Sequence, residues 1–225
     1  MTRLVLWDID HTLIATRGVG RELSAAAFEA TLGVPMQRQA KIDGITEPVN
    51  FRETAKLHGL TTTRTDFERF AHALTEQHHA HAAELSERGH ALPGAAAALD
   101  RFHRDGVIQS VVTGNVRAVA RIKLEVFGLD QHIDWTIGAY GDDHDERAEL
   151  VRLALQRAAA AATETVLIGD TPADIAAAHA AGTRIVAVAS GRFTPDDFRN
   201  AGTDTVLPDL QDTALLAKYV RTETG

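Results

Sequence analysis

Two aspartates, Asp8 and Asp10, stand one residue apart directly after the short apolar run 4–7, and Thr12 follows them. A third aspartate, Asp170, comes shortly after a second apolar run, 165–168. If both runs are strands of one sheet, these oxygen atoms meet in a small volume. Carboxylates so close raise one another's pKa unless a cation is present, and Mg²⁺ prefers hard oxygen ligands. The pattern therefore indicates a metal site, although Asp8 and Asp10 alone also fit an ordinary turn after a strand.

The loop 169–174, with the sequence GDTPAD, precedes an alanine-rich stretch of helical character. Asp170 is placed to ligate a metal ion. Three roles stay open for Asp174, since it can bind the metal, hold a metal-bound water or cap the following helix.

A second polar loop, Thr113-Gly114-Asn115, follows the apolar run 107–112 and precedes a helical stretch that begins at Val116. A hydroxyl, a glycine and backbone N–H groups at the start of a helix form a cradle suited to a phosphate group. Helix starts favour Thr and Asn as caps in any case, so a purely structural role is an equal alternative for this tripeptide alone.

Short apolar runs alternate with helical stretches along most of the chain. This alternation predicts an α/β fold with a Rossmann-like three-layer core, in which helices cover both faces of a parallel sheet. The expected strands are 4–7, 107–112, 135–137, 165–168, 185–188 and 205–207, and the expected helices are 94–104, 116–127, 146–161, 174–181 and 196–200. Ligands of such sheets bind beyond the carboxyl ends of the strands, which is where Asp8, Thr113 and Asp170 are expected.

About seventy residues between the first two strands differ from the rest of the chain in composition, since they are rich in Ala, Glu, Arg and His. We predict an inserted helical cap domain at 15–88 and a catalytic core formed by 1–14 and 89–225. Helices are expected at 21–32, 48–58 and 66–87. On the last of these, His78 and His81 share a face, but a solvated helix face is favoured over a zinc site for this histidine-rich stretch, which also holds His72 and His79.

Composition narrows the functional classes. The 225 residues carry a formal net charge of -8, which disfavours nucleic acid as a partner, and no apolar stretch approaches the length of a membrane span. The amino terminus does not resemble a secretory signal, so we expect a cytoplasmic protein. The chain contains no cysteine, and its chemistry must therefore rely on oxygen and nitrogen groups.

The order of these loops resembles the haloacid dehalogenase superfamily, specifically its phosphoglycolate phosphatase-like branch. The family's first motif, Asp-x-Asp-x-Thr, stands here as Asp8-Ile9-Asp10-His11-Thr12, its second as Thr113, and its fourth as Gly169-Asp170-Thr171-Pro172-Ala173-Asp174. Members that cleave carbon–halogen bonds lack an aspartate at the position of Asp10. The resemblance therefore favours a phosphatase over a dehalogenase.

The resemblance implies Mg²⁺-dependent hydrolysis of a small phosphate monoester, with a small phosphorylated metabolite as the partner. Asp8 would form an aspartyl-phosphate, and Asp10 would protonate the leaving oxygen and then activate water. Mg²⁺ would be held by an oxygen of Asp8, the main-chain carbonyl of Asp10, and Asp170. In full, the expected catalytic residues are Asp8, Asp10, Thr113 and Arg147, the expected phosphate-binding residues are Thr12, Gly114 and Asn115, and the expected metal residues are Asp8, Asp10, Asp170 and Asp174.

Two positions depart from the family pattern. His11 stands where the first motif usually has Gly, and we expect its side chain to point away from the site. The third motif usually supplies a lysine before a proline, and this chain has no such pair. Arg147 best fits that placement, while Lys123 is the rival and is expected on a solvated helix face.

Several alternatives remain. A phosphomutase or a phosphonate-cleaving enzyme shares the same core acids, and the latter would need Lys41 or Lys56 from the cap to form an imine. A non-catalytic module that binds a phosphorylated ligand is the alternative from another class. The cap is expected to act as a lid, with the segment 41–48 (KIDGITEP) as its contact with the substrate. No oligomeric state is predicted.

Overall fold

The computed structural model describes residues 3–40 and 44–221 of the chain. Their main sheet is parallel, with the strand order β4-β1-β5-β6-β7. These strands are β1 (Leu4–Trp7), β4 (Ile108–Val111), β5 (Thr165–Gly169), β6 (Arg184–Val188) and β7 (Val206–Leu207). In the centre of the sheet, Leu4 pairs with Ile108 on one side and with Thr165 on the other.

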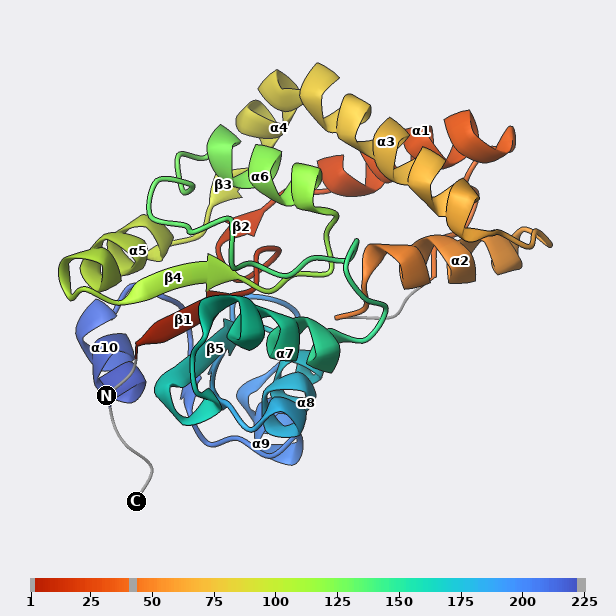
Figure 1. The fold of residues 1–225 in the computed structure, drawn as a ribbon. Helices are drawn as coiled ribbons and strands as arrows, with labels where there is room; N and C mark the ends of the chain where they lie inside the picture. Colours follow the sequence, from red (N-terminus) through yellow and green to blue (C-terminus); the bar gives the residue numbers. More distant parts are fainter. Residues whose placement is uncertain (1–2, 41–43, 222–225) are drawn as a thin grey trace.

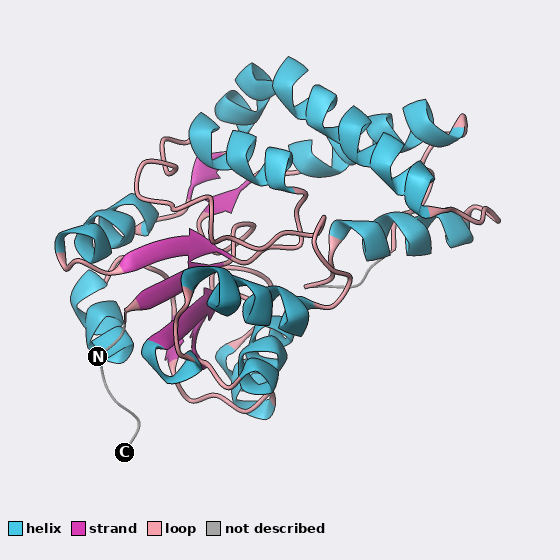
Figure 2. Cartoon of the chain, in the orientation of Figure 1, coloured by secondary structure: helices cyan, strands magenta, loops and turns pink. Residues whose placement is uncertain are grey.

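Helices cover both faces of this sheet (Figures 1 and 2). They are α5 (Ala95–Arg104), α6 (Arg117–Val126), α7 (Arg147–Ala158), α8 (Pro172–Ala181), α9 (Pro195–Asn200) and α10 (Thr213–Arg221), with a short 3₁₀ turn at Ala162–Glu164. Side chains alternate across β1, so Val5 and Trp7 pack against α5, α6 and α10 while Leu4 and Leu6 pack against α7, α8 and α9. Both faces of β1 are thus apolar and buried, which confirms the predicted three-layer α/β core.

A second group of helices lies above the sheet in Figure 1. These are α1 (Val19–Leu32), α2 (Glu47–Leu57), α3 (Arg64–Ala80) and α4 (Ala82–Arg88). Their aromatic core includes Phe28, Phe51 and Phe70, and Val116 and Val119 from the start of α6 join it. The helical layer is therefore packed directly onto the sheet domain through α6.

The chain enters and leaves the helical layer through a two-stranded antiparallel ribbon of β2 (Ile14–Ala15) and β3 (His90–Ala91). Both crossings lie near the boundaries 14 and 89 that the sequence predicts, and the division into two domains stays a prediction. None of the helices in the described part of the chain combines the length and apolar character that crossing a bilayer requires.

Some predicted elements differ from the structure. The strand expected at 135–137 is wrong, because these residues form a turn in which the Asp134 carboxylate accepts a hydrogen bond from the Thr136 N–H at 2.9 Å. The segment reaches the sheet edge only afterwards, where Ala139 donates to the Val111 carbonyl. The helix expected at 66–87 is divided between α3 and α4 at His81. The ribbon β2–β3 and helix α10 are absent from the prediction.

Candidate active site

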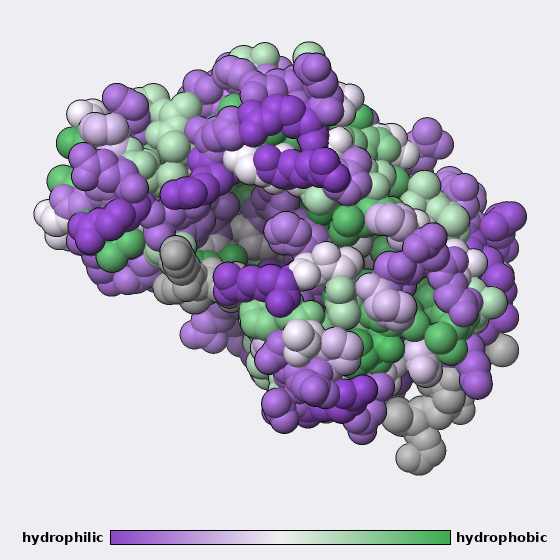
Figure 3. All heavy atoms as spheres, turned by 180° about the vertical axis from the view of Figure 1, so that it is seen from behind, coloured by the Kyte–Doolittle hydropathy of each residue, from purple (hydrophilic) through white to green (hydrophobic). Residues whose placement is uncertain are grey.

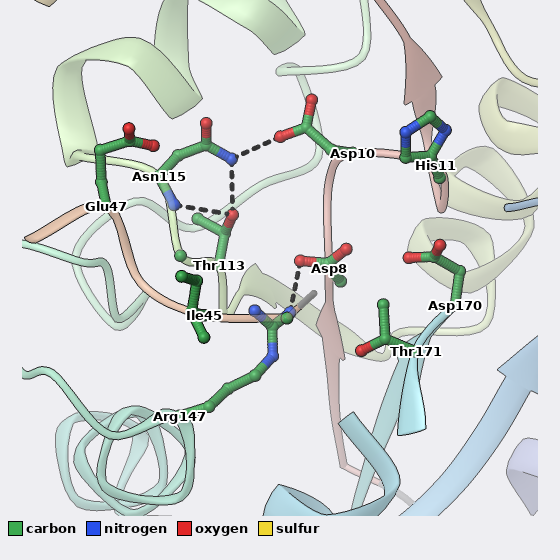
Figure 4. A pocket seen from close by; sticks show the side chains of 12 residues that line it. Asp8, Asp10, His11, Ile45, Glu47, Thr113, Asn115, Arg147, Asp170 and Thr171 are labelled. Atoms are coloured by element: carbon green, nitrogen blue, oxygen red, sulfur yellow. Dashed lines mark hydrogen bonds and ion pairs between the residues drawn. The ribbon is translucent and has the colours of Figure 1, made fainter. Parts of the chain in front are cut away.

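A pocket of about 160 Å³ lies beyond the carboxyl ends of β1, β4 and β5. Residues from all the loops singled out in the sequence line it, together with residues at and just before the start of α2 (Figure 4). They are Asp8, Asp10, His11, Gly44, Ile45, Glu47, Thr113, Gly114, Asn115, Arg147, Asp170 and Thr171. The parallel sheet thus brings together side chains that are up to 163 positions apart in sequence, since the span runs from Asp8 to Thr171 (171 - 8 = 163).

Asp8 is held at the end of the central strand, where its N–H donates to the Ile168 carbonyl at 2.9 Å. One carboxylate oxygen accepts a hydrogen bond from Nη2 of Arg147 at 2.5 Å, and the hydroxyl of Thr12 lies 3.5 Å from the other. Burial raises the pKa of Asp8, as do the nearby carboxylates Asp174 and Asp10, while Arg147 lowers it. Asp8 is therefore an enclosed carboxylate whose charge depends on neighbouring cations.

Arg147 begins helix α7, and its buried guanidinium joins two acidic loops. Nε donates to Asp174 at 2.6 Å while Nη2 reaches Asp8. The two carboxylates outweigh the effect of burial and raise the pKa of Arg147. A planar guanidinium in this position can also meet a phosphate group. Arg147, which the sequence predicts in place of the missing lysine of the third motif, therefore supplies a cation to the pocket.

Asp174 takes part in the cap of helix α8, whose N-cap residue is Thr171, and it also belongs to the acidic cluster beside the pocket. Its carboxylate accepts hydrogen bonds from the N–H and hydroxyl of Thr171, at 3.0 and 2.7 Å, which forms a capping box. The predicted role of Asp174 as a helix cap is confirmed. The other carboxylate oxygen binds Arg147, so capping does not remove Asp174 from the acidic cluster.

Three carboxylates, those of Asp8, Asp170 and Asp174, each offer one oxygen within 4.8 Å of the others. Burial and the charges of Asp8 and Asp174 raise the pKa of Asp170. Hard oxygen donors that repel one another in a buried site fit a divalent cation such as Mg²⁺. The Asp10 carboxylate is not part of this cluster, which leaves its main-chain carbonyl as the expected Asp10 ligand. Among the described residues, no group of three or more potential metal ligands includes a histidine of α3.

Asp10 points instead toward a second cation, Lys123. The ammonium group donates to both carboxylate oxygens of Asp10 and to Oδ1 of Asn115, each at 2.8 Å. Although burial opposes it, the charge of Lys123 holds the pKa of Asp10 below its usual value. Lys123 is 6% exposed, so its predicted place on a solvated face is wrong. Helix α6 is covered on one side by the sheet and on another by the cap.

Asn115 connects this pair to the second motif. Its amide nitrogen donates to Asp10 at 2.7 Å and to the hydroxyl of Thr113 at 2.8 Å. The Asn115 side chain thereby fixes both neighbours (Figure 4). Thr113, Gly114 and Asn115 all line the pocket, and their predicted contact with phosphate stays a prediction.

Part of the cap segment reaches the same pocket. Gly44, Ile45 and Glu47 line it, and the N–H of Glu47 donates to the Gly114 carbonyl at 2.8 Å. A Cβ at Gly114 would lie 2.3 Å from the Ile45 carbonyl oxygen, so only glycine permits this approach. Lys41, with the rest of 41–43, lies outside the described residues. Seen from behind, the surface is hollowed between the helical layer and the sheet, with mostly hydrophilic residues around the hollow (Figure 3).

His11 occupies a left-handed backbone conformation, with φ of 63°. Glycine adopts this conformation freely, which explains why a glycine suits this motif position. His11 is among the residues that line the pocket, and the expected direction of its side chain, away from the site, stays a prediction. The Ser190 hydroxyl donates to the His11 carbonyl at 2.5 Å and ties this loop to the loop that follows β6.

Two side chains have an environment that was not predicted from the sequence, namely Glu47, which belongs to the predicted contact segment 41–48, and His78 on α3. Glu47 enters from the start of α2, and burial raises its pKa to about 7. His78 on α3 is 2% exposed, so the prediction of a solvated face is wrong for it. The signal for His78 was its spacing from Phe67, Phe70 and Leu74, which are buried on the same face of α3.

The sequence profile of the haloacid dehalogenase-like hydrolases matches residues 5–188. The pyrophosphatase PpaX of Halalkalibacterium halodurans is 28% identical over 213 residues, which cover 92% of the chain and 94% of the relative. A phosphoglycolate phosphatase of Cupriavidus necator is 31% identical over 137 residues, 59% of the chain and 58% of the relative. The crystal structure of a hydrolase from Pseudomonas syringae matches with a TM-score of 0.74 at 21% identity, covering 99% of the chain and 100% of that structure. Since the profile spans the chain from β1 through β6, this protein belongs to the haloacid dehalogenase-like hydrolase family.

Proposed function

We propose that the chain hydrolyses a small phosphate monoester in a Mg²⁺-dependent reaction through an aspartyl-phosphate on Asp8. The observation that carries this proposal is the placement of Asp8, a buried carboxylate with Arg147 on one oxygen and Asp170 beside it. A carboxylate so placed can act as a nucleophile while a neighbouring guanidinium offsets the charge of the phosphoryl group. The family membership and the names of its relatives support a phosphatase.

The first step forms a bond between an Asp8 oxygen and phosphorus. The ester P–O bond breaks, its electron pair goes to the leaving oxygen, and Asp10 supplies that oxygen with a proton. In the second step a water oxygen attacks phosphorus, Asp10 takes the proton, and the acyl P–O bond returns its electron pair to Asp8. Asn115 and Lys123 orient the Asp10 carboxylate for both transfers, through hydrogen bonds of 2.7 and 2.8 Å.

Mg²⁺ bound by Asp8 and Asp170 would supply positive charge between the nucleophile and the phosphoryl oxygens. Asp174 belongs to the same cluster and can ligate the ion directly or through water. Thr113 and the amides of Gly114 and Asn115 are proposed to bind the phosphoryl oxygens, with the Thr12 hydroxyl linking Asp8 and Asp170 at 3.5 and 3.3 Å.

The imine route to phosphonate cleavage has less support. Lys56 is exposed, forms an ion pair with Glu53 at 2.7 Å, and does not line the pocket. The other cap lysine, Lys41, lies outside the described residues.

Steady-state hydrolysis of para-nitrophenyl phosphate and of a panel of phosphate monoesters, with and without Mg²⁺, tests the proposal. Wild-type turnover should require Mg²⁺, and Asp8→Asn should abolish it. Transfer of phosphate within a sugar phosphate, rather than its release, would identify a mutase. Binding of phosphate esters with no turnover of any would favour the non-catalytic module and overturn the proposal.

A further inference from the structure

A second cavity, of about 320 Å³, lies between the cap helices α1 and α3 and the core helix α6. Asp10, His11, Glu47 and Asn115 line both this cavity and the pocket around Asp8. A molecule whose phosphoryl group lies at Asp8 therefore extends past Asp10 into the second cavity. Its volume is near the lower end of the roughly 300–1,000 Å³ typical of small-molecule sites.

His78 is the most deeply buried titratable side chain that lines this cavity, with an exposure of 2%. Its Nδ1 lies 2.8 Å from the Leu74 carbonyl, one turn earlier on α3. A carbonyl only accepts hydrogen bonds, so Nδ1 carries the proton. Burial lowers the pKa of His78 to about 4, and the ring is therefore neutral at pH 7. Nε2 is left as a hydrogen-bond acceptor.

No group among the described residues donates a hydrogen bond to Nε2 of His78. An unpaired buried acceptor is costly, and such groups in native proteins usually meet a partner. Lys123, which lines the same cavity, does not supply one, since its ammonium group is already bonded to both oxygens of Asp10 and to Asn115. The side chain that carries this unsatisfied nitrogen is one of those that line a cavity adjoining the reacting centre.

The inner part of this cavity favours ligand groups that donate hydrogen bonds. His78 offers an acceptor, and Glu47 adds a partly buried carboxyl group whose Oε1 lies 3.4 Å from the Asn50 amide nitrogen. Asp10 contributes a further carboxylate. Of the cations that line the cavity, Arg21 is on the exposed side. An anionic leaving group without donors would meet like charge at Glu47 and leave His78 unpaired.

We propose that this cavity binds the leaving group of the substrate, that the leaving group carries hydroxyl groups, and that His78 determines this specificity by accepting a hydrogen bond from one of them. The inference rests on the proposed phosphatase function and names its substrate class as phosphate monoesters of polyhydroxylated compounds. Glycolate, as a leaving group, has no hydroxyl other than the esterified one and cannot satisfy Nε2.

The test compares glycerol 3-phosphate with propyl phosphate, which has the same carbon chain without the two hydroxyl groups. Wild-type kcat/KM should be roughly tenfold to hundredfold higher for glycerol 3-phosphate, and higher than for phosphoglycolate. His78→Phe removes the acceptor but keeps a ring, and it should lose most of that preference, mainly through KM for glycerol 3-phosphate. His78→Gln keeps an acceptor and should retain part of the preference. His79→Phe, at the exposed neighbouring position, should behave as the wild type.

An equal kcat/KM for the two esters in the wild type would overturn the inference, as would an unchanged ratio in His78→Phe or a preference for phosphoglycolate. Should His78→Phe fail to fold, the wild-type comparison and His78→Gln still decide the question. Acetyl phosphate separates the two proposals, because its small leaving group tests the Asp8 chemistry itself. Wild-type hydrolysis of acetyl phosphate without discrimination between the esters overturns only the specificity. Absence of that hydrolysis overturns the proposed function and the inference with it.

Discussion

Replacing Arg147 by methionine removes a buried charge while keeping much of the side chain's volume. Arg147 is 8% exposed, and its partners Asp8 and Asp174 are 9% and 0% exposed at their side chains. The substitution leaves two buried carboxylates without their shared cation. Breaking a buried ion pair by removing one partner typically costs about 3–5 kcal/mol, and we expect the Mg²⁺-free variant to lose this much unfolding free energy at pH 8.

The loss should depend on pH in a defined direction. Without Arg147 the pKa of Asp8 in the folded variant rises further above the ordinary carboxyl value near 4, because burial already raises it and the cation that lowers it is gone. Between the ordinary and the raised value, the folded variant binds more protons than the unfolded chain, so its stability falls as pH rises. The deficit relative to the wild type should therefore be larger at pH 8 than at pH 5.

Urea unfolding at both pH values, in the presence of a chelator, measures this deficit. Arg152→Met is a matched control on the same helix, because Arg152 is 46% exposed and pairs with Glu149 three residues earlier. We expect this control to lose less than about 1 kcal/mol. A loss for Arg147→Met no larger than that of the control at pH 8 would refute the reasoning, and so would a deficit that is larger at pH 5.

Three further outcomes are expected. Lys123→Met should lower the unfolding free energy by about 1–2 kcal/mol, less than Arg147→Met, because the side chain of Asp10 is 36% exposed and water screens its charge. Urea titration checks this, with Lys56→Met, a substitution of an exposed lysine, as the control. A loss equal to that of Arg147→Met would contradict the prediction. One fixed Mg²⁺ concentration, a hundred times the dissociation constant at pH 8, should stabilise the wild type by about 2.7 kcal/mol at pH 8. The same concentration should stabilise it by less at pH 5, where protons compete with Mg²⁺ for Asp8 and Asp170. Thermal unfolding measures this, and equal gains at both pH values would argue against the carboxylate site. His11→Gly should raise the unfolding free energy by about 0.5–1 kcal/mol, because φ of 63° strains a side chain but not glycine; a loss of stability in urea would show that the side chain contributes more than the strain costs.

The sheet and its strand-end residues were predictable because their signals are local. Each of Asp8, Thr113 and Asp170 directly or closely follows a short apolar run, and parallel strands place such positions at one edge. The side chains of Leu4 to Trp7 point alternately into two apolar cores, one on each face of the sheet. Because both faces are buried, the strand appears in the sequence as an uninterrupted apolar run. Tertiary contacts were not needed to find these residues.

The position of Lys123 depends on contacts that the local sequence does not record. Taken alone, a lysine within a helix is usually solvated. Lys123 follows Val119 by one turn, and Val119 packs into the aromatic core of the cap. Only the cap's placement on α6 turns this face inward, where Asp10 and Asn115 satisfy the ammonium group. His78 differs from Lys123, because its spacing from Phe70 and Leu74 on the buried face of α3 is a local signal of its burial.

The sequence predicts a strand at 135–137 because its residues, Trp, Thr and Ile, favour extended structure. Side-chain hydrogen bonds override that preference. The Asp134 carboxylate accepts from the hydroxyl of Thr136 at 2.6 Å, and the Tyr140 hydroxyl donates to the Trp135 carbonyl at 3.2 Å. These bonds favour a turn and bring the chain back to the edge of β4 at Ala139.

The central claim is that Asp8 carries the phosphoryl group during turnover. Rapid acid quench of the wild type with a hydrolysed phosphate ester, followed by borohydride reduction, converts an aspartyl-phosphate to homoserine, which peptide mass spectrometry can locate. We predict homoserine at Asp8 in the presence of Mg²⁺, and none at that position in Asp8→Asn. Modification at another residue, or turnover with no modified residue at any quench time, would contradict the account.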